Sequence, residues 1–184
     1  MITVQFTVRP GQGDASGFDL GDMTVTGYLG TADSAGHVPD QGMMIYPSVV
    51  QLLNSLGDFL RGNARVLTFT GADTSFSLVV RRTKDGLSVA GKDGLVDRTT
   101  EAEFTSAVMH ATDDLGRNLP PEDTVTSDWE AALQPLLSSV LSSQVDKGRT
   151  REAGLQATAA ASGVQATHTT FITVGGRPAW PSAE

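Results

Sequence analysis

The period of the apolar residues changes along the chain, and each change predicts a different element. Residues 2–9 alternate strictly, with apolar side chains at the even positions, which is typical of a half-buried strand. Residues 23–29 alternate again. A Gly-rich loop follows each run, at 10–17 and at 30–42. We therefore expect two strands, each followed by a loop, before the first helix.

The densest apolar block, residues 47–61, has a helical period. Its apolar side chains recur at steps of three and four, which places them on one stripe: Val49, Leu52, Leu53, Leu56, Phe59 and Leu60. Pro47 near the start is compatible with a first helical turn, and Gly62 follows the end. The stripe is wide, so this helix is expected to be largely buried against the sheet.

Short alternating runs fill residues 65–97, separated by turn signals. The sequence Lys-Asp-Gly-Leu occurs twice there, beginning at Lys84 and at Lys92. Asp-Gly favours a hairpin because glycine adopts positive φ without steric cost. These residues predict an antiparallel meander.

Two more helices are expected near 101–116 and 128–145. Thr100 and Glu103 have the spacing of a capping box, and Gly116 ends the first helix. Ser127 and Glu130 have the same spacing and suggest the start of the second. Pro135 lies inside the second pattern, so either that helix kinks or a new helix begins there.

The order of these elements predicts an α+β fold. We expect an antiparallel sheet of about five to six strands, including the meander at 65–97, packed on helices near 47–61, 101–116 and 128–145. This single domain is expected to cover residues 1–147. Residues 148–184 form an Ala/Thr/Gly-rich C-terminal tail, with a short apolar run at 170–174 that suggests one more strand. The sequence lacks the βαβ alternation of doubly wound nucleotide-binding folds.

Composition narrows the classes of function. The 184 residues carry a net charge of −8 and contain no cysteine, which excludes disulfide scaffolds and thiolate chemistry. An acidic chain is a poor match for nucleic acid or for an anionic membrane. The first residues lack the basic start and apolar core of a signal peptide, and no apolar run is long enough to span a bilayer. We expect a soluble, cytoplasmic protein.

The acidic residues gather in two stretches that lead into and out of the predicted helices. No Lys or Arg lies between Arg9 and Arg61. Arg117 is the one cation of the second stretch. The carboxylates that we predict to bind a partner are Asp14, Asp19, Asp22, Asp33, Asp40, Asp113, Asp114, Glu122 and Asp123.

Motifs for catalysis, metal or cofactor are missing from the sequence. His110 precedes Asp113 and Asp114 at helical spacing, yet a metal site needs further ligands, so we interpret the three as solvated. Asp14, Asp19 and Asp22 do not have the spacing of a calcium loop. No phosphate loop or nucleophile elbow is present. We expect no cofactor and favour a non-enzymatic role, while a site built from carboxylates alone stays open.

In size, acidity and element order, the chain up to Val145 resembles small acidic α+β immunity proteins, which neutralise a toxin by occluding its active site. The resemblance implies a non-enzymatic protein that binds a basic protein partner through an acidic face. Two alternatives remain. One is a small-molecule-binding or carboxylate-dependent enzyme domain with a pocket between sheet and central helix. The other is a structural subunit that forms an assembly through its C-terminal tail.

Overall fold

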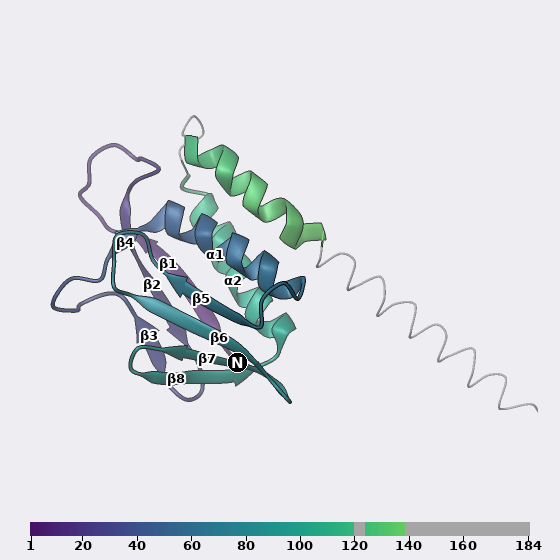
Figure 1. Cartoon of the computed structure of the whole chain (residues 1–184). Helices are drawn as coiled ribbons and strands as arrows, with labels where there is room; N and C mark the ends of the chain where they lie inside the picture. The colour runs from purple at the N-terminus through teal and green to yellow at the C-terminus, as the bar shows by residue number, and fades with distance from the viewer. Residues whose placement is uncertain (120–123, 139–184) are drawn as a thin grey trace, which may run out of the picture. The chain divides into compact units, whose positions relative to one another are not determined.

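The computed structural model describes residues 1–119 and 124–138 (Figure 1). The chain divides into two compact units, Met1–Ser143 and Gln144–Glu184. The predicted tail, with its strand at 170–174, lies outside the described residues.

Eight strands and three helices make up the described part of the chain. The strands are β1 (Thr3–Val8), β2 (Leu20–Thr26), β3 (Thr31–Asp33), β4 (Met43–Met44), β5 (Val66–Thr70), β6 (Ser77–Thr83), β7 (Gly86–Gly91) and β8 (Gly94–Thr99). The helices are α1 (Ile45–Leu60), α2 (Glu101–Gly116) and an unlabelled third helix over residues 124–138, drawn in light green in Figure 1.

The strands form two antiparallel four-stranded sheets. In sheet A, β2 pairs with β1 on one side and with both β3 and β4 on the other. In sheet B, β5, β6, β7 and β8 follow one another in chain order, as the predicted meander requires. Gly86 and Gly94, which follow the two hairpin turns, have φ of 139° and 135°, so both repeats use glycine where a side chain would be strained.

The α+β prediction is confirmed, but the strands are divided between two sheets instead of forming one. The sequence pattern missed β3, which lies inside the loop predicted at 30–42, and β4, which follows that loop directly. Their three and two residues are too few to show a period. Both pair with the long strand β2, and they complete the first sheet before the chain enters α1.

Helix α1 supplies the centre of the hydrophobic core. Five of the six stripe residues are buried, with Leu52, Leu53 and Phe59 fully so, and Leu60 packs against the core from a partly buried position. Tyr46, at the start of the helix, is also buried. Its ring contacts Trp129 of the third helix edge-on at 6.1 Å, and its hydroxyl donates to the main-chain oxygen of Asn118. Tyr46 thus links α1 to Asn118, which follows α2, and to Trp129 of the third helix.

Two of the predicted helix ends are confirmed and one is wrong. Gly62 has φ of 79° directly after α1, and Thr100 with Glu103 forms the predicted capping box of α2. The predicted capping box at Ser127 is wrong. The third helix already includes residue 124, and the Ser127 hydroxyl donates to the Thr124 oxygen inside it. The helix also continues through Pro135; its predicted part beyond 138 lies outside the described residues.

The two sheets meet where β3 faces β7 and where the β2–β3 turn reaches β8. A Cβ atom added to Gly91 of β7 would lie 2.7 Å from the Cβ atom of Ala32 in β3. Along the same joint, the Leu29 N–H donates to the Val96 oxygen at 3.0 Å. The sheets therefore contact at a distance that only a missing side chain allows.

We predict that Gly91→Ala destabilises the protein by about 1–3 kcal/mol, because the new methyl group forces the sheets apart. Gly57→Ala, in the middle of α1, is the matched control. Its Cβ would meet only the flexible guanidinium of Arg61, at 3.4 Å. That variant should be neutral or more stable by up to about 1 kcal/mol. Denaturant unfolding measures both, and equal effects would contradict the tight joint.

Candidate functional site

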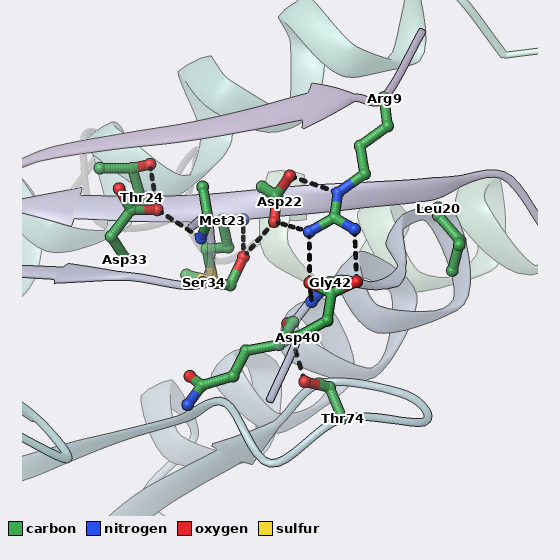
Figure 2. A network of polar contacts seen from close by, with 12 residues as sticks. Arg9, Leu20, Asp22, Met23, Thr24, Asp33, Ser34, Asp40, Gly42 and Thr74 are labelled. Atoms are coloured by element: carbon green, nitrogen blue, oxygen red, sulfur yellow. Dashed lines mark hydrogen bonds and ion pairs between the residues drawn. The ribbon is translucent and has the colours of Figure 1, made fainter. Parts of the chain in front are cut away.

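A polar cluster around Arg9 holds together the two loops that the acidic residues occupy. Arg9 follows directly after β1, and its main-chain N–H donates to the Leu20 oxygen at 2.9 Å, which extends the β1–β2 pairing by one residue. Its guanidinium lies between Asp22, on β2, and Asp40, in the loop before β4 (Figure 2).

The guanidinium binds both carboxylates in bidentate fashion. Nε and Nη2 donate to the two oxygens of Asp22 at 2.7 and 2.8 Å. Nη1 and Nη2 donate to the two oxygens of Asp40 at the same two distances. The planar fork of arginine matches a carboxylate in this geometry, and a lysine would offer only a point charge.

Asp22 is the buried member of this cluster. Its side chain is 11% exposed, against 64% for Asp40. Asp22 also accepts from the Ser34 hydroxyl at 2.9 Å, and that hydroxyl in turn accepts from the Met23 N–H. Ser34 itself is fully buried. The carboxylate therefore joins the end of β1 to the first residue of the second loop.

Gly42 leaves room for the guanidinium. A Cβ atom at this position would lie 2.5 Å from the Cζ atom of Arg9. The Gly42 N–H also donates to Asp40, at 3.1 Å. The glycine therefore allows the arginine to lie flat against the main chain while Asp40 is held from its other side.

These contacts shift the pKa values of all three groups in favour of their charged forms. Hydrogen bonds to Asp40 and Asp22 raise the pKa of the Arg9 guanidinium. The hydrogen bonds from Arg9 lower the pKa of Asp22, and burial opposes that shift only in part. Arg9 and the Gly42 N–H lower the pKa of Asp40 well below its usual range. The cluster therefore stays ionised, and its carboxylates act as structural acceptors and not as proton donors.

The first loop has further internal contacts. The Gln12 side-chain amide donates to the main-chain oxygens of Arg9 and Leu20, both at 2.7 Å, and its oxygen accepts from the Leu20 N–H. The Asp19 carboxylate accepts from the Ser16 N–H, and the Asp19 main-chain oxygen accepts from the Ile45 N–H of α1. The loop is thereby fixed to the strand ends and to the first turn of the central helix.

The loops present large apolar side chains to solvent. Phe18 is 63% exposed, Val38 is 98% exposed and Leu20 is 41% exposed. We call this region, residues 10–20 with residues 34–42, the loop surface. Both loops project from the same end of the sheets, on the left in Figure 1, and Arg9 joins them directly. The surface thus combines apolar and acidic groups on a hydrogen-bonded frame.

The structure brings five of the nine predicted carboxylates to the loop surface or its frame. Asp14 is exposed, Asp33 is half-buried, Asp19 and Asp22 are buried, and Asp40 pairs with Arg9. Asp33 accepts hydrogen bonds from the Thr24 hydroxyl and from the Ala35 N–H. Arg9 pairs with two of these five carboxylates, Asp22 and Asp40, so the region keeps a negative charge.

The other predicted carboxylates lie elsewhere. Asp113 and Asp114 lie at the end of α2 and pair with Arg117 at 2.8 and 3.1 Å. Glu122 and Asp123 lie outside the described residues. Asp113 and Asp114 therefore share a local arginine, Arg117, and are not among the carboxylates that pair with Arg9.

Sequence reasoning missed the role of Arg9 and the exposed apolar residues. Arg9 is the last cation before six aspartates that have no other Lys or Arg among them. This position could have indicated that Arg9 pairs with more than one of these aspartates. Phe18 and Val38 stand alone in Gly- and Asp-rich loops, where no period indicates whether a side chain is buried.

Residues 1–119 and 124–138 contain no group of three His, Asp or Glu side chains that could hold a metal ion. His37, on the loop surface, has Nε2 within 2.8 Å of the Asp33 main-chain oxygen. His110 is exposed on α2.

A groove lies between α2 and the third helix. This groove has a volume of about 400 Å³ and is lined mainly by apolar side chains, among them Met109, Trp129 and Leu133. Asp113 is the one carboxylate that lines it. It is not the pocket between sheet and central helix that an enzyme domain was expected to have.

Comparison with known proteins gives no relative: no family model matches the chain, and neither a curated protein nor a solved structure matches it. Within the described residues, no helix has both the length and the apolar character needed to cross a membrane.

We predict that Asp22→Asn lowers the free energy of unfolding by about 1–2 kcal/mol, because it removes charge-assisted hydrogen bonds from a mostly buried site. Asp58→Asn is the control, since it breaks an exposed ion pair with Arg61 three residues away. Its effect should be much smaller. Chemical denaturation compares the two, and equal losses would show that burial of the Arg9 cluster contributes little.

The same cluster predicts the pH dependence of stability. The pKa of Asp22 lies below its ordinary value of 3.8 in the folded state. Its contribution is therefore fully present above pH 3.8 and falls as the pH drops below that value. The stability of Asp22→Asn should change less with pH in this acid range than that of the wild type. Urea midpoints measured through the range test this, and parallel curves would contradict it.

Proposed function

We propose that this protein is a non-enzymatic interaction protein that binds a basic protein partner through its loop surface. The observation that carries the proposal is the arrangement around Arg9. One half-buried, doubly bidentate arginine fixes two loops whose outer residues are apolar and acidic.

Exposed apolar side chains support binding as the role of this surface. Phe18 and Val38 are large apolar side chains that lie mostly in solvent. Each belongs to a loop that is held by hydrogen bonds. A fixed loop loses little conformational freedom when it binds, so more of the contact energy appears as affinity. Phe18 is the aromatic side chain of this surface, and aromatic residues are enriched at protein interfaces.

The charge of the surface supports a basic partner. Asp14, Asp33 and Asp40 lie at least partly in solvent, and Arg9 is the one cation of the frame. Lysine and arginine side chains on a partner would complement this charge and accelerate the encounter.

The occlusion of a toxin's active site, as in immunity proteins, is one form that this function takes. Such an inhibitor needs a preformed surface and no chemistry of its own, and both properties agree with the Arg9 frame. We place the protein in the cytoplasm, consistent with a chain that contains no cysteine.

The test is affinity capture from native lysate with three baits, followed by mass spectrometry. The wild type is compared with Phe18→Ser/Val38→Ser. The matched control is Tyr28→Ser/Leu29→Ser, which removes two side chains of similar exposure, 88% and 52%, from the β2–β3 turn. We expect a basic protein to be enriched by the wild type and by the control but lost with the loop variant. Its recovery should fall as the salt concentration rises.

A partner captured equally by all three baits would contradict the loop surface as the binding site. Captured proteins that are acidic, or whose recovery does not change with salt, would contradict the basic partner. Circular dichroism of the three baits is needed first, since the comparison requires that all are folded.

A further inference from the structure

The outer face of sheet B is a second surface of opposite charge. Along β5, β6 and β7 the burial alternates, with Leu67, Val80 and Val89 turned to the core. The alternate positions point away from the core, because successive side chains of a strand lie on opposite faces. Their exposed or half-buried members are Val66, Thr68, Thr70, Ser77, Val79, Arg81, Ser88, Ala90, Leu95 and Arg98. We call this set the outer face.

The strand register places two arginines in one row across this face. Arg81 of β6 is opposite Ser88 of β7, and Ser88 is opposite Arg98 of β8. The two arginines are therefore two strand spacings apart, about 10 Å between their Cα atoms. A small serine between them leaves space above the sheet for both long side chains.

Neither arginine of the row has an ion-pair partner among residues 1–119 and 124–138. The neighbouring Arg82 differs, since it pairs with Glu101, donates to the Phe59 oxygen and lies over the Phe59 ring. At the two hairpin turns, Lys84 is followed by Asp85 and Lys92 by Asp93, so these turns are neutral overall. The positive charge of the outer face therefore comes from Arg81 and Arg98.

Apolar groups lie beside the two arginines. Val66, at the other end of the row, is 40% exposed. In the next row, Val79 and Ala90 are half-buried and Leu95 is 37% exposed. The face thus combines small polar, apolar and cationic side chains. This composition suits an extended protein segment that lies across the strands.

We propose that the outer face of sheet B binds an acidic segment of another protein, with Arg81 and Arg98 as the residues that pair with its carboxylates. The guanidinium fork binds a carboxylate through two parallel hydrogen bonds. A segment with carboxylates about 10 Å apart reaches both arginines at once and covers apolar side chains of the neighbouring row. The protein then has two binding surfaces with opposite charge preference, and it connects a basic partner to an acidic one.

A protein segment fits this face better than nucleic acid does. Binding of nucleic acid draws its affinity from many phosphate contacts, and here two free cations belong to a chain of net charge −8. Exposed aromatic side chains, on which bases stack, are absent from the outer face as defined above.

The test uses fluorescein-labelled polyglutamate as the probe, with fluorescence anisotropy at low ionic strength. The variant Arg81→Gln/Arg98→Gln is compared with the wild type. The control is Arg61→Gln/Arg117→Gln, which changes the net charge equally but removes arginines that already pair with aspartates. We expect the first variant to bind at least about tenfold more weakly, since two charge-assisted pairs are lost. The control should stay within about twofold of the wild type.

Three outcomes would overturn the proposal. These are no binding of polyglutamate by the wild type, equal weakening in both double variants, and tighter binding of a fluorescein-labelled oligonucleotide than of polyglutamate. Self-association in sedimentation experiments that is lost in Arg81→Gln/Arg98→Gln would assign the face to a second copy, and would also overturn it. The loop variant Phe18→Ser/Val38→Ser should bind polyglutamate normally, so this proposal and the proposed function can fail separately.

Discussion

The ion pair of Arg9 with Asp22 and Asp40 is the interaction on which the arrangement of the loops depends. Two long connections leave sheet A at one end, and neither has a regular structure of its own. A single guanidinium satisfies both carboxylates and contacts the main chain at Gly42. Because Asp22 is nearly enclosed, the pair is screened less by solvent than a surface ion pair and holds a defined geometry.

The hydrophobic core provides the frame to which this cluster is attached. Helix α1 buries its stripe against strands of both sheets, and Tyr46 joins it to the third helix and to Asn118. The Asp19 main-chain oxygen accepts from the Ile45 N–H at the start of α1. This hydrogen bond attaches the first loop to the first turn of the central helix. Burial of large apolar side chains thus fixes the helix, and the helix fixes the loop.

The sequence predicted the elements that have a period and missed those that do not. Helix α1, helix α2 with its capping box, and the meander of β5–β8 follow from repeated apolar spacing and from turn glycines. The division into two sheets did not follow, because a period identifies a strand but not the strand with which it pairs. Strands β3 and β4 of sheet A are in addition too short to show a period. The false capping box at Ser127 has a similar cause. The spacing is correct, but the helix already includes residue 124, and a motif of two residues cannot show which turn is the first.

For the candidate site, the sequence located the acidic region but not its organisation. Charge density along the chain identified Asp14 to Asp40. It did not show that Arg9, which precedes them, would neutralise two of the aspartates at once, because that contact joins residues 31 positions apart. The exposure of Phe18 and Val38 likewise depends on how the loops lie against the strand ends. The opposite charge of the outer face follows from register, and register is a property of paired strands.

The short turn between β2 and β3 protects the folded protein against aggregation through the edge strand β8. An edge strand offers a row of free main-chain groups to any other extended chain, and such rows promote aggregation. At β8 the Leu29 N–H already occupies the Val96 oxygen, and the exposed Tyr28 stands beside it. The turn therefore interrupts the open side of sheet B near its middle. A shorter turn would leave the main-chain groups along β8 free, and other extended chains could then pair with this strand.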